Sequence, residues 1–234
     1  PFNKIIINHM PITDWLPENR PREKLITHGA SYLTDAELLA IFLRVGIVGK
    51  SAVDLANELI QHFGSLSALF NTNLKELSKI KGMGEAKFVQ LQAVLEMSRR
   101  ALGDQLKQNA AFNDISSLKT FIQLQLAHKT EETLLILFLT PTLHLISAEI
   151  IATGGLTHVS LPIRDIVQRA LSINAHGLIL AHNHPHGKAQ PSAEDIQSTQ
   201  ILKTQLQPLN LHLHDHLITA EGEAAYSLVE NGLL

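Results

Sequence analysis

The stretch Gly177-Leu178-Ile179-Leu180-Ala181-His182-Asn183-His184-Pro185 joins an apolar run to two alternate histidines. The apolar run has the length and composition of a buried strand. Ser192 then predicts the N-cap of a helix, with Asp195 in its first turn. We therefore expect two imidazoles at the end of a strand to meet a carboxylate from the next helix.

His182, His184 and Asp195 are three candidate metal ligands. A hydrolytic zinc site uses three protein ligands and leaves a fourth position for water. The chain has no cysteine, so any metal must be held by His, Asp or Glu. Two simpler interpretations exist: Ser192 and Asp195 form a helix capping box, and the two histidines lie in a solvated turn. The combined pattern favours a site for one zinc ion per chain.

The composition describes a globular protein long enough for two ordinary domains. Of the 234 residues, 45% are hydrophobic and 18% are charged, which is enough apolar material for a core. No apolar run approaches the about 20 residues of a membrane span, and no signal-peptide pattern opens the sequence. We expect a cytoplasmic protein without membrane contact.

Charge and histidine divide the chain into two parts. Residues 1–107 hold 13 Lys/Arg against 11 Asp/Glu, and residues 108–234 hold 6 against 11. Three of the 13 histidines lie in the first part and ten in the second. This difference predicts two domains, an N-terminal arm with a helical domain over residues 1–107 and a metal-binding domain over residues 114–234. A net charge of +2 on the first part is small for a nucleic-acid binder.

The N-terminal part alternates helical patterns with glycine and proline. The proline-rich residues 1–24 predict an extended arm that docks through Trp15. Cap residues predict helices that start near Asp35 and Ala52. Residues 101–113 lose helical periodicity and predict a linker.

Residues 74–87 predict a short helix, a tight turn and a second helix from Glu85 to about Arg100. This segment resembles a helix-hairpin-helix motif, in which backbone N–H groups receive a DNA phosphate without reading sequence. The residues that this resemblance assigns to DNA are Lys79, Lys81, Gly82, Gly84 and Lys87. The alternative is a structural hairpin whose glycines only permit the turn.

Apolar strands alternate with helices in the C-terminal part. Strands are predicted at residues 133–140, 144–152, 177–181 and 211–218, and helices at 116–126, 163–173, 193–206 and 223–230. Buried strands flanked by helices predict an α/β fold with a layered sheet.

The spacing from His182 to Asp195, with a glutamate on an upstream strand, resembles the JAMM (MPN+) metalloprotease signature. More broadly, residues 15–234 are similar to RadC proteins. The stretches that carry this similarity are 18–25, 35–40, 49–52, the hairpin at 74–87, 181–185 and 215–218. The resemblance implies a cytidine-deaminase-like MPN domain preceded by an all-α helix-hairpin-helix domain. It also implies that His182, His184 and Asp195 bind zinc, and that Ser192 donates a hydrogen bond to the oxyanion.

By the same resemblance Glu149 is the general base that takes a proton from water and passes it to the leaving amine. An unpaired carboxylate on an apolar strand is costly, which favours a functional role for Glu149. Glu131 and Glu132 are less suitable in this interpretation, because they lie at the start of a strand.

The other histidines of this region have several interpretations. RadC proteins usually have Ser-Gly after the proline, whereas this chain has His186-Gly187. We interpret His186 as a solvated loop residue, with a substrate contact or a rival ligand as alternatives. A period of two places three further histidines on one strand face, as structural residues or as support for the ligands. These are His212, His214 and His216.

These observations predict a zinc-dependent amide hydrolase, a metallopeptidase or isopeptidase, that acts on a protein or peptide. The alternative is a DNA-binding protein associated with repair or recombination through the helix-hairpin-helix. The DNA-repair label of RadC proteins is not a demonstrated activity. Metal-dependent action on nucleic acid is a third possibility, although nucleases commonly use paired metals.

Overall fold

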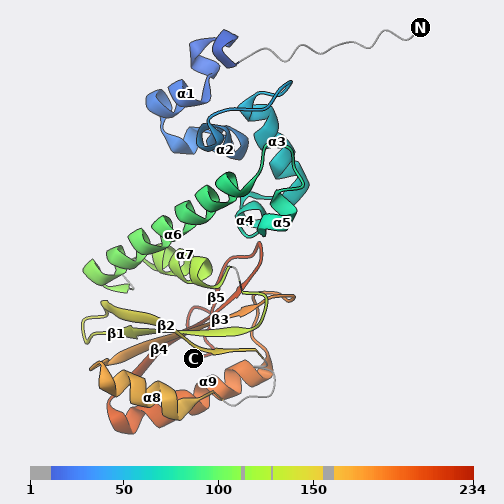
Figure 1. Ribbon diagram of the computed structural model, residues 1–234. Helices are drawn as coiled ribbons and strands as arrows, with labels where there is room; N and C mark the ends of the chain where they lie inside the picture. Colours follow the sequence, from blue (N-terminus) through green and yellow to red (C-terminus); the bar gives the residue numbers. More distant parts are fainter. Residues whose placement is uncertain (1–11, 112–113, 128, 155–160) are drawn as a thin grey trace. The chain divides into compact units, whose positions relative to one another are not determined.

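The computed structural model describes residues 12–111, 114–127, 129–154 and 161–234 (Figure 1). The chain divides into two compact units, residues 1–94 and 95–234. A helical N-terminal region precedes a C-terminal sheet covered by helices, which confirms the predicted fold class. Each unit has an apolar core of its own.

The first unit is helical. Its helices are α1 (Pro21–His28), α2 (Asp35–Leu43), α3 (Ala52–Phe63), α4 (Leu66–Phe70), α5 (Leu74–Leu77) and the first part of α6 (Glu85–Gln108). Capping boxes at Thr34 and Ser51 start α2 and α3 as the sequence predicts. The expected arm contains two short 3₁₀ turns, and α1 begins at Pro21 because the first helical position tolerates proline. Residues 1–11 of that arm lie outside the described residues.

The second unit contains a five-stranded sheet. Its strands are β1 (Thr133–Leu139), β2 (Leu145–Thr153), β3 (Gly177–His184), β4 (His212–Ala220) and β5 (Tyr226–Ser227). The strand order is β2-β1-β3-β4-β5, in which only the β3–β4 pair is parallel. The helices of this unit are the rest of α6, α7 (Ile115–Leu126), α8 (Ile163–Ser172) and α9 (Ala193–Leu206).

The sheet is buried between two helical layers (Figure 1). Side chains of β1 alternate between the two faces, because successive residues of a strand point to opposite sides. Leu135 and Leu137 pack in the core formed with α7. Leu134 and Ile136 pack in the core formed with α8 and α9. The second face carries the candidate site.

Two sequence predictions in this unit are wrong. The linker predicted at residues 101–113 is helical as far as Gln108, because Leu102 and Leu106 pack against the core. The helix predicted at residues 223–230 is instead the short strand β5 followed by turns. Polar groups of this segment bind the buried Asp215 instead of forming a helix. The Asp215 carboxylate accepts hydrogen bonds from the Ser227 hydroxyl (2.6 Å) and the Val229 N–H (3.1 Å).

Candidate metal centre

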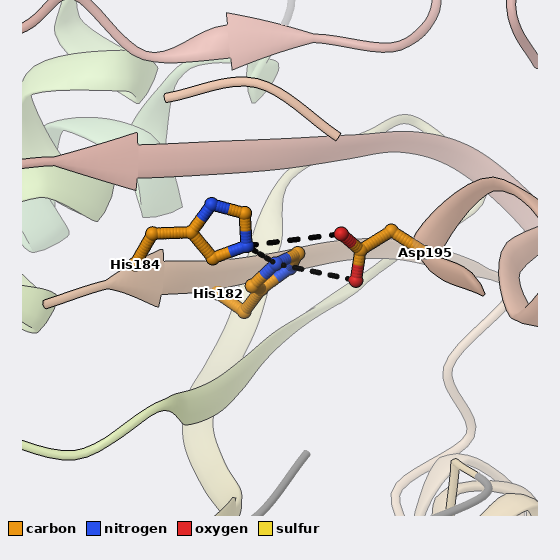
Figure 2. Close-up of side chains that lie close together, drawn as sticks. All are labelled: His182, His184 and Asp195. Carbon is orange, nitrogen blue, oxygen red and sulfur yellow. Dashed lines mark hydrogen bonds and ion pairs between the residues drawn. The ribbon is translucent and has the colours of Figure 1, made fainter. Parts of the chain in front are cut away.

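His182, His184 and Asp195 lie together at the end of β3 and the start of α9 (Figure 2). The two Nε2 atoms are 2.8 Å apart. The Asp195 oxygens lie 3.4 Å from Nε2 of His182 and 3.7 Å from Nε2 of His184. Ligand atoms that share a tetrahedral zinc ion are roughly 3.3 Å apart, given bonds of about 2.0–2.2 Å. The three predicted ligands therefore have a spacing that suits one metal ion.

The capping box places Asp195. The N–H (2.8 Å) and hydroxyl (2.7 Å) of Ser192 both donate to Oδ2 of Asp195, and the Asp195 N–H donates back to Ser192 Oγ (3.1 Å). Its other oxygen, Oδ1, faces His182. The capping and metal-ligand interpretations are thus compatible, since one carboxylate does both. Ser192 lies beside the cluster, and its hydroxyl hydrogen is directed to Asp195.

The tautomer of His184 follows from the hydrogen bond of Nδ1, the ring nitrogen that points away from the cluster. Nδ1 lies 2.8 Å from the backbone carbonyl of Lys188. A carbonyl can only accept, so Nδ1 carries a hydrogen, and in the neutral ring, the form that binds a metal, Nε2 keeps its lone pair. That lone pair faces the cluster.

The tautomer of His182 follows from a chain of three buried hydrogen bonds. The Thr199 hydroxyl donates to the backbone carbonyl of Asp195 (2.5 Å), so its oxygen accepts from Nδ1 of His216 (2.6 Å). Nε2 of His216 is then an acceptor for Nδ1–H of His182 (2.8 Å). Nε2 of His182 is consequently left with a lone pair that faces the cluster.

Three groups that can each offer a lone pair to a metal therefore converge. Burial lowers the pKa of His182 to about 4, although the charge of Asp195 acts in the opposite direction. The imidazole of His182 is therefore neutral at pH 7. Burial acts to raise the pKa of Asp195, but the interactions of its carboxylate with His184, His182 and Ser192 outweigh burial and lower the pKa. Neutral imidazoles and an ionised carboxylate are the ligand forms that a divalent cation requires.

Glu149 lies away from this cluster, which corrects the expectation that it faces the metal. It is on the edge strand β2, opposite Ile136 of β1. Ile136 is in turn opposite Leu180, two residues before His182. The carboxylate of Glu149 is bound by two guanidinium nitrogens of Arg169, at 2.7 and 2.8 Å. The polar partner that a strand carboxylate needs is therefore an arginine of α8.

Glu132 is an acidic residue whose charge acts on the site. Leu134 pairs with His182, and the Thr133 N–H donates to Asn183 Oδ1 (2.8 Å). Glu132 lies two residues before Leu134, just ahead of the first residue of β1. Hydrogen bonding to Asp195 is the main cause that raises the pKa of His184, and the charge of Glu132 adds to it. Sequence reasoning set Glu132 aside because it cannot determine strand register.

A bulge in β4 separates the three histidines that were predicted to share one face. Leu178 pairs with Leu213 and Ile179 pairs with Asp215, so His214 is the extra residue. Leu213 and His216 consequently lie on the same face, towards α9, although they are three positions apart. His216 supports a candidate ligand, whereas His212 is exposed and contacts the ring of His214 instead. His186 is exposed in the loop after β3.

The predicted DNA-contacting lysines of the first unit have different environments. Nζ of Lys79 is paired with Glu76 (2.5 Å), and Nζ of Lys87 donates to the backbone carbonyl of Leu43 (2.5 Å). Lys81 is exposed. The hairpin itself requires Gly82, because its φ is +90° and a Cβ there would lie 2.4 Å from Ile47 Cγ2. Gly84 has open space around it.

The fold and the cluster together define a helix-covered α/β domain with a possible His/His/Asp metal site. A family description, "RadC-like JAB domain", matches residues 112–233, and a second, "UPF0758 N-terminal", matches residues 12–89. A UPF0758 protein of Herminiimonas arsenicoxydans is 49% identical over 96% of this chain and 100% of its own length. UPF0758 proteins of Janthinobacterium sp. and Nitrosomonas eutropha are each 48% identical with the same coverage.

The chain belongs to the RadC-like JAB family, as the sequence resemblance predicts. Among the residues with a described structure, no helix combines the length and apolar character needed to cross a bilayer.

Proposed function

We propose that this protein is a zinc-dependent amide hydrolase, a metallopeptidase or isopeptidase of the JAMM type acting on a protein or peptide. One observation carries the proposal: two imidazoles, each with its outer nitrogen hydrogen-bonded, and one carboxylate bring their ligand atoms together around a shared point. Three protein ligands leave a coordination position for water, which is characteristic of catalytic rather than structural zinc sites.

His182, His184 and Asp195 would hold the ion. When bound, zinc would polarise the scissile carbonyl and lower the pKa of a water molecule towards about 7. Glu132 is our candidate for the general base, because its charge acts on His184 and it precedes the strand whose Leu134 pairs with His182. Its carboxylate would accept a proton from water and deliver it to the leaving amine.

Ser192 is our candidate for the oxyanion donor. Its hydroxyl now donates to Asp195 Oδ2, as does its backbone N–H. The backbone bond would keep Asp195 in place if the hydroxyl turned to a developing oxyanion. In this proposal the capping residue therefore has a second use during the reaction.

Metal content of the purified chain is the direct test. We expect about one zinc per chain by elemental analysis of the wild type, and its loss in the His182→Ala/His184→Ala double variant. His186→Ala is the matched control, because it removes an exposed histidine two residues after His184. Loss of zinc in this control would identify His186 as a ligand instead.

A wild-type chain that takes up no zinc, even when zinc is offered, would contradict the proposal. With zinc bound, hydrolysis of peptide and isopeptide substrates is the second measurement. Full hydrolysis by the double variant would refute the assigned ligands.

The DNA-binding alternative has less support from the side chains. Of the three predicted lysines, Lys79 is ion-paired and Lys87 is bonded within the unit, so Lys81 is the one exposed without such a bond among the described residues. DNA binding stays a prediction of the sequence resemblance.

A further inference from the structure

The first unit contains a cavity that the proposed hydrolase function does not use. Its volume is about 240 Å³, and its charged walls are Arg20, Arg22, Glu23 and Arg44. The rest of the lining includes apolar side chains such as Ile41. Three guanidinium groups and one carboxylate give the lining a formal charge of +2.

Arg20 and Glu23 form the part of the wall that has internal partners. Nε of Arg20 donates to the carbonyl of Trp15 (3.0 Å), and a terminal nitrogen donates to the carbonyl of Thr13 (2.7 Å). The other terminal nitrogen lies 3.6 Å from the Glu23 carboxylate. Glu23 therefore offsets the charge of an arginine that is already held in place.

Arg44 is presented by an unusual turn. Its φ is +68° and its ψ is −42°, and the Val45 N–H donates to the carbonyl of Leu43 (2.8 Å), which closes a three-residue γ-turn. This turn is rare and strained for a residue other than glycine. Glycine would adopt this turn at a lower cost. The presence of arginine at this position therefore indicates that its side chain has a use.

Lys87 stabilises this turn from α6. Its Nζ donates to the same carbonyl of Leu43 that closes the γ-turn. Burial lowers the pKa of Lys87, and the nearby positive charge of Arg44 lowers it further. The positive charges of Lys87 and Arg44 are therefore close to each other, and the hydrogen bond from Lys87 to Leu43 stabilises the turn that carries Arg44.

Arg22 and Arg44 are exposed, and within the described residues neither side chain makes a hydrogen bond or ion pair. Unpaired guanidinium groups that line one cavity suit an oxyanion, because they donate in a planar, forked arrangement. A lining charge of +2 matches a dianion better than a carboxylate. The volume is below the about 300–1,000 Å³ of pockets that enclose a whole small molecule.

We infer that the cavity bounded by Arg20, Arg22 and Arg44 binds a phosphate group, either free phosphate or the terminal phosphate of a nucleotide chain. The lining contains none of the five residues that the helix-hairpin-helix resemblance assigns to DNA, although one of them, Lys87, supports the turn at Arg44. It also does not depend on the proposed hydrolase function.

Calorimetric titration of the whole chain with inorganic phosphate tests this inference at constant ionic strength. We expect saturable binding at one site, and weaker binding of acetate. Fluorescence of Trp15, the only tryptophan, should change in parallel, because its carbonyl is bonded to Arg20. A short oligonucleotide with and without a 5′-phosphate separates the two sources: a gain from the phosphate indicates a terminal phosphate, and equal binding of both indicates free phosphate.

Arg44→Gly is the decisive variant, because glycine suits the positive φ and the unit should fold at least as well as before. It should weaken phosphate binding by roughly tenfold to a hundredfold, as expected when a charge-assisted bond is lost. Lys81→Ala is the matched control that removes an exposed charge outside the cavity. Absence of saturable phosphate binding, equal binding of acetate, or an equal loss in Lys81→Ala would overturn the inference.

Discussion

The two units differ in what they bury. In the first unit the buried side chains of the described residues are apolar, with Leu43, Leu55 and Leu59 at its centre. In the second unit buried polar side chains accompany the apolar core. They are Thr133, His182, Asn183, Thr199, Asp215, His216, Thr219 and Ser227. Each of these side chains makes a hydrogen bond within the unit, which offsets the about 1–3 kcal/mol that a buried polar group without a partner would cost.

The buried polar groups also position the candidate site. Asn183 points away from its two histidine neighbours and accepts from Thr133 N–H, while its amide nitrogen donates to the carbonyls of Lys129 (3.0 Å) and Glu131 (3.2 Å). These bonds hold the segment before β1 against the end of β3. The comparison teaches that polar contacts in the second unit fix the geometry of a site, whereas apolar packing is sufficient in the first.

The largest expected effect separates the two candidate general bases. Glu132→Gln should lower the rate of amide hydrolysis by about 10²–10⁴-fold, because it removes proton transfer and keeps the side-chain shape. Glu149→Gln is the matched control and should retain most of the activity, since it only weakens the pair with Arg169. Zinc content should be unchanged in both variants. The reverse pattern of activities would restore Glu149 as the base.

Acid should destabilise the second unit of the metal-free protein. The folded pKa of His182 is about 4, below its ordinary 6.5, because the ring is buried. Between these values the unfolded chain binds a proton that the folded chain does not, so the free energy of unfolding falls as pH drops. The loss from this group is roughly 3 kcal/mol by pH 4. Burial lowers the pKa of His216 in the same sense, and the raised pKa of His184 opposes part of the effect.

Urea unfolding between pH 7 and pH 4 measures this dependence, and hydrogen exchange locates it. Early opening of β3 and α9, with the α2–α3 helices still protected, is the expected order. The variant His182→Gln should show a flatter pH dependence. An unchanged slope in this variant would show that another group controls acid stability.

His216 should affect metal binding without touching the metal. His216→Ala removes the acceptor for Nδ1–H of His182 and the donor to Thr199, and we expect metal affinity to fall about 10–100-fold. His216→Gln should recover part of it, because an amide can accept at one end and donate at the other. His212→Ala, an exposed position of the same strand, is the control. Competition with a chromophoric chelator gives the affinities; no difference between His216→Ala and wild type would contradict the tautomer assignment.

The smallest expected effect is that of a substitution on the surface of the first unit. Lys81→Glu should change the free energy of unfolding by less than about 0.5 kcal/mol, as for most exposed substitutions. If the hairpin contacts DNA, this change should weaken duplex binding and reduce its salt dependence. Fluorescence anisotropy with labelled duplex DNA at two salt concentrations measures both. Unchanged anisotropy titrations would remove the hairpin from consideration as a DNA site.

Local patterns in the sequence determined the fold class and the three candidate ligands. The alternation of His182 and His184 at a strand end, and the position of Asp195 in a capped first turn, depend only on neighbouring residues. For the same reason the caps at Thr34 and Ser51 could be predicted.

Tertiary structure decided the features that depend on strand register and long-range packing. Register placed Glu149 opposite Ile136, where it pairs with Arg169, and a bulge turned His216 towards α9. Contacts with the core extended α6 through residues predicted as a linker. The pairing of a strand is set by interactions between residues far apart in the chain, so a period within one strand cannot reveal it.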